Sequence, residues 1–145
     1  MIPEMQYFEL DELVCPHVYN KYHLVAWQFF DPRLLITIER LRQLINKPVF
    51  VNNWKDGGQF SQRGFRCIQC DLVKSAITEE RLYVSPHMIG KGIDCDIEGL
   101  VAEEVRQWIF KKQGLFPYPL RLESNVSWVH IDVMDTGNKV YLFNK

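Results

Sequence analysis

The chain has 145 residues, of which 47% are hydrophobic and 24% charged, and its formal net charge is −1. Because domains average about 150 residues, we expect one domain over residues 1–145, and the composition excludes long disorder. The near-neutral charge leaves no general polybasic surface, so we expect no nucleic-acid partner. Aromatic residues make up 13%, which would leave aromatic side chains beyond the core to line a groove.

Residues 1–31 are rich in aromatic side chains and show little periodicity, so they predict an irregular segment with one helical turn at Leu10–Val14. Asp31 followed by Pro32 is a helix-start signal, with the aspartate as N-cap. Apolar residues then recur at helical spacing, which predicts a helix from Pro32 to about Asn46.

The middle of the chain predicts two strands separated by polar segments. Pro48–Val51 has the apolar composition of a short buried strand, and the glycine-rich stretch 52–66 is typical of a loop. Residues 67–83 favour helix, with a start signal at Thr78. Gly92–Ile97 predicts a second strand after a turn.

The C-terminal part predicts one more helix, Leu100–Gln113, which ends before Gly114. Three strands are expected after it, at Leu120–Glu123, Ser127–Met134 and Lys139–Phe143, joined as an antiparallel meander. The fold class is therefore expected to be α+β, with helices packed on a small antiparallel sheet.

The N-terminus is acidic and has neither the basic segment nor the apolar run of a signal peptide. No stretch approaches the about 20 apolar residues that cross a bilayer. We therefore expect cytoplasmic synthesis and no transmembrane segment, and we expect a monomer. In a chain without a signal peptide, the four cysteines are expected to be free thiols or metal ligands rather than disulfides.

Three residues predict a metal site. His87 lies in a turn, Asp94 in the strand after it and His130 in a late strand. Two imidazoles and one carboxylate are a normal ligand set for catalytic zinc, with a fourth position left for water. The alternative is a surface histidine and a second histidine packed in the sheet. Cys95 points to the opposite face from Asp94, so we expect Cys95 in the core.

The segment Ser85–Asp94 resembles the S-x-H-x-x-G-x-A-x-D signature of zinc peptidases of the D-alanyl-D-alanine carboxypeptidase-like group, which share a metal fold with lysostaphin and the Hedgehog signalling domain. Gly92 replaces the usual alanine. Downstream, Trp128-Val129-His130 resembles the W-x-H motif that supplies the third ligand of that group. The resemblance implies the fold of that group, and it implies a zinc ion held by His87, Asp94 and His130.

The resemblance also implies a glutamate that acts as general base near the third ligand. In several branches it stands three residues before the histidine, where this chain has Ser127, so Glu123 is our candidate. If the flanking strands pair around residues 124–127, Glu123 faces Trp128 and Arg121 faces His130. Glu123 is then a diagonal neighbour of His130, with Cα atoms about 7–8 Å apart. The alternative is an exposed carboxylate at a strand end.

Three further polar residues are candidates for substrate or metal support. The family uses an arginine after its first strand to bind substrate, and Arg63 is our choice, with Arg66 beside it and a solvated loop arginine as the alternative. Ser85 either orients substrate or holds the turn before His87. Asp132 shares a face with His130, and it is either a hydrogen-bond partner of that ligand or a solvated carboxylate.

Cys67-Ile68-Gln69-Cys70 is a lone C-x-x-C, which on its own is weak support for a metal site or a redox pair. Cys15 and His17 could complete a Cys3His zinc site with it. The alternative is a set of unpaired thiols packed near the core.

Together the motifs imply a zinc-dependent peptidase that hydrolyses peptidoglycan stem peptide, as a D,D-carboxypeptidase or an L-alanyl-D-glutamate endopeptidase. An N-terminus without a signal peptide fits a phage or prophage lysis enzyme, which reaches the cell wall through a membrane hole, or a cytoplasmic dipeptidase. The alternative is a non-catalytic, metal-binding module on the same fold that recognises a peptide or a protein.

Overall fold

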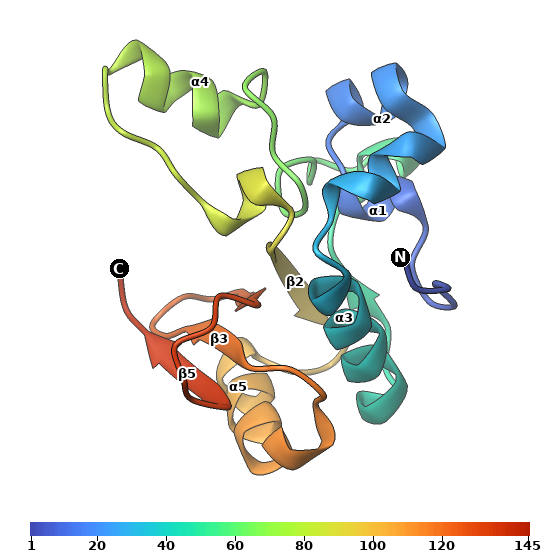
Figure 1. The fold of residues 1–145 in the computed structure, drawn as a ribbon, viewed down its shortest axis with the longest axis vertical. Coiled ribbons are helices and arrows are strands. Elements are labelled where there is room, and N and C mark those ends of the chain that lie inside the picture. The colour runs from blue at the N-terminus through green and yellow to red at the C-terminus, as the bar shows by residue number, and fades with distance from the viewer.

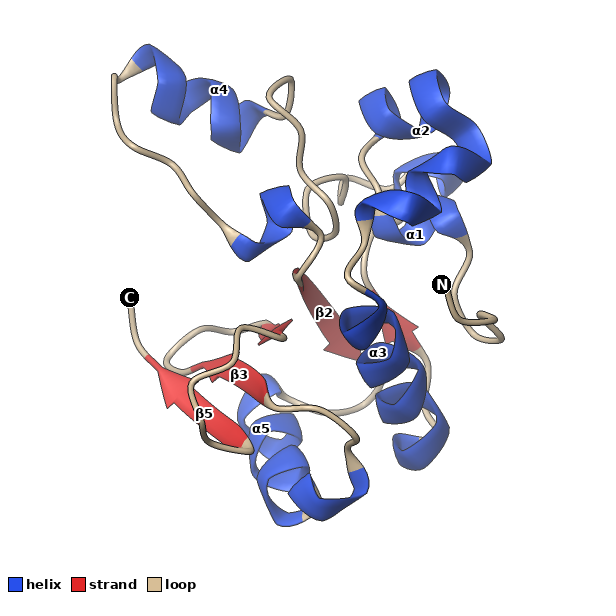
Figure 2. Ribbon diagram, in the orientation of Figure 1, coloured by secondary structure: helices blue, strands red, loops and turns tan.

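The computed structural model describes residues 1–145, and in it five α-helices and one five-stranded mixed sheet form an α+β fold (Figure 1, Figure 2). The expected α+β class is confirmed, but the sheet is mixed and not antiparallel throughout. The helices are α1 (Leu10–Leu13), α2 (Pro16–Tyr22), α3 (Pro32–Ile45), α4 (Asp71–Thr78) and α5 (Ala102–Lys111). The strands are β1 (Val49–Phe50), β2 (Gly92–Ile97), β3 (Leu120–Glu123), β4 (Val129–Asp132) and β5 (Val140–Phe143).

The strands lie in the order β1-β2-β4-β3-β5. The first four pair antiparallel with their neighbours, whereas β5 runs parallel to β3. The expected antiparallel meander is therefore wrong at its last strand. The reason is that β2 occupies the outer edge of β4, where Ile93 pairs with Ile131. After β4 the chain reverses and reaches the free edge of β3 instead (Figure 1).

The hairpin of β3 and β4 differs from the expected register by two residues. Arg121 pairs with Asp132, and Leu122 pairs with Ile131. The loop between β3 and β4 covers residues 124–128 and so includes Trp128, because β4 begins at Val129. Continued by one residue, this register places Glu123 directly opposite His130, where we had expected a diagonal neighbour. The two residues therefore lie closer than predicted and still share one face of the sheet.

Helix α3 agrees with its prediction. The Asp31 side chain accepts a hydrogen bond from the Arg33 amide at 2.9 Å, which caps the first turn. The helix ends at Asn46, whose φ of 51° is in the left-handed region. Its apolar face carries Leu34, Ile38 and others into a core of 29 buried residues that extends from Phe8 to Val140. Cys95 belongs to this core, as expected.

The N-terminal segment is more regular than predicted. Besides α1 it contains α2 and a 3-10 helix at His23–Phe29. Pro16 provides the first residue of α2, and the aromatic side chains pack on one another rather than on a periodic face. The rings of Tyr22 and Phe29 lie 4.9 Å apart, and those of Tyr19 and Trp54 lie 5.6 Å apart.

Helix α4 ends at Thr78, the residue at which we had expected it to begin. A residue of the preceding loop stabilises its first turn, because the Leu72 amide donates a hydrogen bond to the Gln62 side chain at 2.9 Å. Helices α1, α2 and α4 lie at the opposite end of the molecule from β3, β5 and α5 (Figure 1). None of the helices has both the length and the apolar character that a membrane crossing requires.

Candidate metal centres

The structure brings His87, Asp94 and His130 together. Asp94 on β2 pairs directly with His130 on β4, so the sheet itself sets these two side by side. His87 lies in a 3-10 helix, Pro86–Ile89, whose first turn is capped by Ser85. Ligand atoms of the three residues all lie within 4.8 Å of one another, and the three could hold a metal ion.

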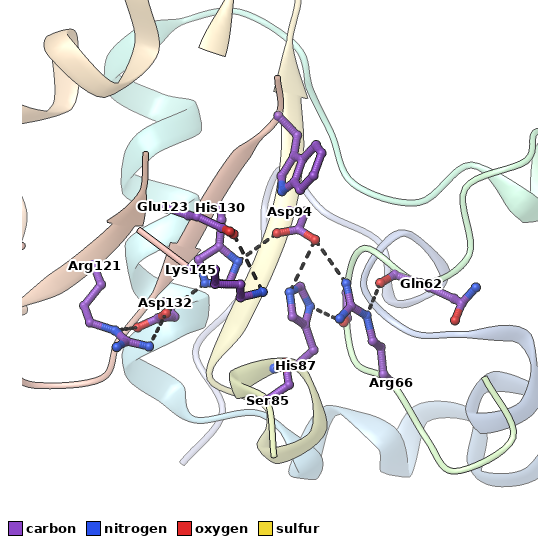
Figure 3. A network of polar contacts seen from close by, with 12 residues as sticks. Gln62, Arg66, Ser85, His87, Asp94, Arg121, Glu123, His130, Asp132 and Lys145 are labelled. Carbon is purple, nitrogen blue, oxygen red and sulfur yellow. Dashed lines mark hydrogen bonds and ion pairs between the residues drawn. The ribbon is translucent and has the colours of Figure 1, made fainter. Parts of the chain in front are cut away.

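The distances within this cluster fit the donor atoms of one ion (Figure 3). His130 Nδ1 lies 2.8 Å from Asp94 Oδ1, and His87 Nε2 lies 3.3 Å from Asp94 Oδ2. Zinc bonds of about 2.0–2.2 Å in a tetrahedron put neighbouring donor atoms about 3.3–3.5 Å apart. The distance from His87 to Asp94 matches this spacing, and the distance from His130 to Asp94 is about 0.5 Å shorter.

Both imidazoles are oriented by their other nitrogen. His87 Nδ1 donates to the Gly64 carbonyl at 2.9 Å, so Nε2, 3.3 Å from Asp94 Oδ2, is the nitrogen that could bind a metal. His130 Nε2 lies 2.8 Å from Asp132 Oδ2, which leaves Nδ1 on the side of Asp94. This is how metal-binding histidines are usually held. Asp132 is fully buried, and Arg121 donates two hydrogen bonds to its carboxylate, at 2.8 and 2.9 Å. Asp132 is therefore the hydrogen-bond partner of His130 and not a solvated carboxylate.

The electrostatics favour an anion between the two rings. Burial raises the pKa of Asp94, but hydrogen bonds from His130 and His87 outweigh it and hold the pKa well below its usual range. Burial lowers the pKa of His87. Burial also opposes the charge on His130, but Asp132 and Asp94 raise its pKa above the ordinary value. Asp94 is therefore a carboxylate at neutral pH, as a metal ligand must be.

Glu123 is 4% exposed, so the alternative of an exposed carboxylate at a strand end is wrong. Its nearest cation is the Lys145 amine, 3.9 Å from Oε2 (Figure 3). Arg106 donates to the backbone carbonyls of Glu123, Val126 and Trp128, and so fixes the loop that follows. Glu123 is thus a buried carboxylate on the His130 face, held in place through its backbone.

The two candidate arginines have different partners. Arg63 pairs with Asp96 at 2.8 Å, and its guanidinium lies 4.5 Å from the centre of the Phe60 ring. Arg66 donates to Asp94 Oδ2 at 3.1 Å. Both are 9% exposed, so the solvated-loop alternative is wrong. Arg66, the second choice from sequence, is the one that contacts the ligand set, and no local sequence signal distinguishes the two, because the path of a long loop decides it.

Two cavities flank the cluster. One, of about 390 Å³, includes Asp94 in its wall, and the other, of about 380 Å³, includes His130. Other residues of the first are Phe60, Arg63, Arg66, Ser127 and Trp128, and other residues of the second are Ser85, Arg121, Phe143 and Lys145. Ser85 also accepts a hydrogen bond from the His87 amide at 3.3 Å, so it holds the turn as well as facing a cavity.

A second group of ligand atoms lies elsewhere in the molecule. Cys15, His17, Cys67 and Cys70 each offer one atom within 4.8 Å of the others, and they could hold a metal ion. This is the combination that the sequence offered as a Cys3His site. All cysteines of the chain are free, including the buried Cys95, which is not part of the group.

Comparisons with known proteins do not assign the chain to a family: no family model, curated protein or solved structure matches it significantly.

Proposed function

We propose that the protein is a zinc-dependent peptidase that cleaves peptidoglycan stem peptides, as a D,D-carboxypeptidase or an L-alanyl-D-glutamate endopeptidase. The observation that carries the proposal is the convergence of His87, Asp94 and His130, with the buried Glu123 on the His130 face. The substrate class rests on the likeness of the two motifs that contain these ligands to those of the D-alanyl-D-alanine carboxypeptidase-like group.

The donor set suits catalytic zinc. Two histidines and one carboxylate leave a fourth position for water or substrate, and an oxygen ligand leaves more positive charge on the ion than a thiolate would. When bound, zinc supplies Lewis-acid polarisation of the scissile carbonyl and lowers the pKa of water from about 15.7 towards 7. The chain holds the ligands ready through Gly64, Asp132 and Arg121.

Glu123 is the general base of the proposed reaction. It takes a proton from the attacking water and passes it to the nitrogen of the leaving amine, so that one carboxylate serves both halves of the reaction. Its burial keeps it out of bulk water, and its backbone is fixed by Arg106.

The cavities suit an anionic peptide. Arg63 and Arg66 lie in the wall of one, and Arg121 and Lys145 in the wall of the other. Stem peptides carry several carboxylates, which guanidinium groups bind through paired hydrogen bonds. Trp128, 39% exposed, adds an aromatic surface for the peptide backbone. As a phage or prophage lysis enzyme, the protein would meet this substrate after release through the membrane.

A second function, metal-dependent recognition of a peptide or protein without hydrolysis, is favoured by a different observation. The two cations nearest the ligand set are already paired, Arg66 with Asp94 and Arg63 with Asp96, and Ser127 stands where several peptidase branches have a glutamate. A substrate carboxylate would have to compete with these aspartates for the arginines.

The test is hydrolysis of a synthetic stem pentapeptide by the zinc-loaded protein, with products identified by mass spectrometry. Release of the terminal D-alanine identifies the carboxypeptidase, and release of L-alanine identifies the endopeptidase. Glu123→Gln should lower turnover by about 10²–10⁴-fold with zinc retained. Glu98→Gln, an exposed carboxylate at the end of β2, is the matched control and should keep full turnover. Zinc binding without cleavage of any stem peptide would assign the recognition module instead.

A further inference from the structure

The group of Cys15, His17, Cys67 and Cys70 joins two parts of the chain that are far apart in sequence. Cys15 precedes α2, and His17 lies in the first turn of that helix. Cys70 precedes α4, and Cys67 lies in the loop before it. The peptidase function proposed above uses none of these four side chains.

Four of the six distances between the ligand atoms of this group are close to the edges of a zinc tetrahedron. The Sγ atom of Cys67 lies 3.6 Å from Cys15 Sγ, 4.0 Å from Cys70 Sγ and 3.6 Å from His17 Nδ1. Cys70 Sγ lies 4.0 Å from His17 Nδ1. Zinc bonds of about 2.3 Å to sulfur and about 2.0 Å to nitrogen predict edges of about 3.8 Å between sulfurs and about 3.5 Å from sulfur to nitrogen. A disulfide would need about 2.05 Å.

The donor set and its surroundings point to zinc as well. Three thiols and one imidazole make a closed site of four protein ligands, which is the structural rather than the catalytic form of zinc site. The Gln69 amide points at Cys67 Sγ, 3.4 Å away, and an amide donor of this kind stabilises a thiolate. Cys95 and His23, the remaining cysteine and a nearby histidine, lie outside the group.

The loop that carries Cys67 also carries groups of the first cluster. The Phe65 amide donates to the Leu13 carbonyl at 2.7 Å, and the Arg66 amide donates to the His87 carbonyl at 3.1 Å. Gly64, directly before these two residues, accepts a hydrogen bond from His87 Nδ1 at 2.9 Å. A Cβ on Gly64 would lie 2.0 Å from the Leu13 carbonyl oxygen, so this close approach requires glycine. The loop is thus clamped between the N-terminal segment and His87.

We propose that Cys15, His17, Cys67 and Cys70 bind a structural zinc ion, which ties α2 to the 63–70 loop and so holds the Gly64 carbonyl and Arg66 against the His87–Asp94–His130 cluster. This site is independent of whether the protein hydrolyses a peptide.

The experiment counts zinc in the purified full chain by mass spectrometry of the elements, after exhaustive dialysis. The wild type should hold about two zinc ions per chain, one lost in Cys67→Ser and the other lost in His87→Ala. His23→Asn, which changes an exposed histidine outside the group, should keep both.

If Cys67→Ser does not fold, a second measurement tests the proposal without that variant. Titration of the native wild type with a mercurial thiol reagent should release one zinc ion and leave the other bound. In cobalt-substituted protein, a thiolate-to-cobalt charge-transfer band should be present in the wild type and in His87→Ala. A wild type whose zinc is untouched by the mercurial, the absence of that band, or a disulfide among these cysteines would each overturn the proposal. None of these outcomes depends on peptide cleavage, so the proposed function can fail separately.

Discussion

The two candidate metal clusters differ in how the fold makes them. His87, Asp94 and His130 are all at least nine-tenths buried, and two of them face each other across paired strands. The Cys15–Cys70 group instead joins two helix starts across a loop, and its histidine is exposed. Three ligands between two cavities leave a position for chemistry, whereas four ligands close the site. The number of protein ligands and the space beside them therefore separate a reactive site from a structural one.

The largest effect is expected from removing the shared anion of the first cluster. Asp94→Asn should abolish both metal binding at this cluster and peptide hydrolysis, because Asp94 contacts both histidines and Arg66. The zinc of the second cluster should remain. Metal content and hydrolysis of the stem peptide check this, with Asp96→Asn as a matched variant that should keep both ions. Retention of two ions by Asp94→Asn would show that the first cluster is not a metal site.

The second cluster can be tested through thermal stability. His17 is exposed, so in the absence of a bound metal its substitution by alanine should change the free energy of unfolding by only about 0.5 kcal/mol. If zinc is bound there, we expect His17→Ala to lower Tm by about 5 °C or more. Differential scanning fluorimetry measures the shift, and His23→Asn is the control. Equal Tm values for the two variants would contradict the structural zinc.

The partner of His130 should tune metal affinity without being a ligand. Asp132→Asn keeps the shape but loses the charge that Arg121 and His130 share. We expect zinc affinity at the first cluster to fall by about 10–100-fold, measured by competition with a chromogenic chelator. Unchanged affinity would mean that Asp132 serves only the packing of the sheet.

Zinc affinity at the first cluster should also depend on pH. Despite burial, Asp132 and Asp94 raise the pKa of His130 above its usual value of about 6.5. The folded, metal-free protein is therefore stabilised by protonated His130 below about pH 6.5, and this contribution is lost as the pH rises through the raised pKa. Zinc must displace that proton.

Below the raised pKa of His130, zinc binding should release a proton, and affinity should fall by up to about tenfold per pH unit. Calorimetry in two buffers of different ionisation heat measures the released proton. Asp132→Asn should move the dependence to lower pH, because that variant loses one of the two groups that raise the pKa. A zinc affinity that rises on acidification would contradict this assignment.

The smallest effect is expected at the start of α3, outside both clusters. Asp31→Ala removes the cap of α3 and should cost about 1 kcal/mol of stability, measured by urea unfolding of the metal-loaded protein. Neither zinc count nor hydrolysis should change. A loss of metal in this variant would show that the clusters respond to general destabilisation.

Local signals in the sequence predicted the elements that surround the first cluster. Helix α3, with its aspartate cap and apolar period, and strands β2 and β3 lie where composition placed them. The pairing of β5 could not be predicted, because it depends on β2 already occupying the edge of β4. Helix α2 was missed because its aromatic residues pack on neighbouring loops and follow no helical period.

The residues of the candidate site also divide into those that local motifs predicted and those that non-local contacts bring to the site. His87, Asp94 and His130 were found because they stand in two short motifs, and the strand pairing then brings them together. Arg66 and the Gly64 carbonyl reach the cluster through a loop clamped at both ends, by Leu13 and by His87. Such contacts are non-local, so the family resemblance offered both arginines and gave no physical ground for choosing Arg66 over Arg63.

The peptidase function is tested most sharply by stem-peptide cleavage with the zinc-loaded wild type beside Glu123→Gln, with zinc counted in both. We expect cleavage by the wild type, turnover lower by about 10²–10⁴-fold in the variant, and equal zinc in the two proteins. Equal turnover in both proteins, or none in a wild type whose first cluster holds zinc, would rule out this peptidase.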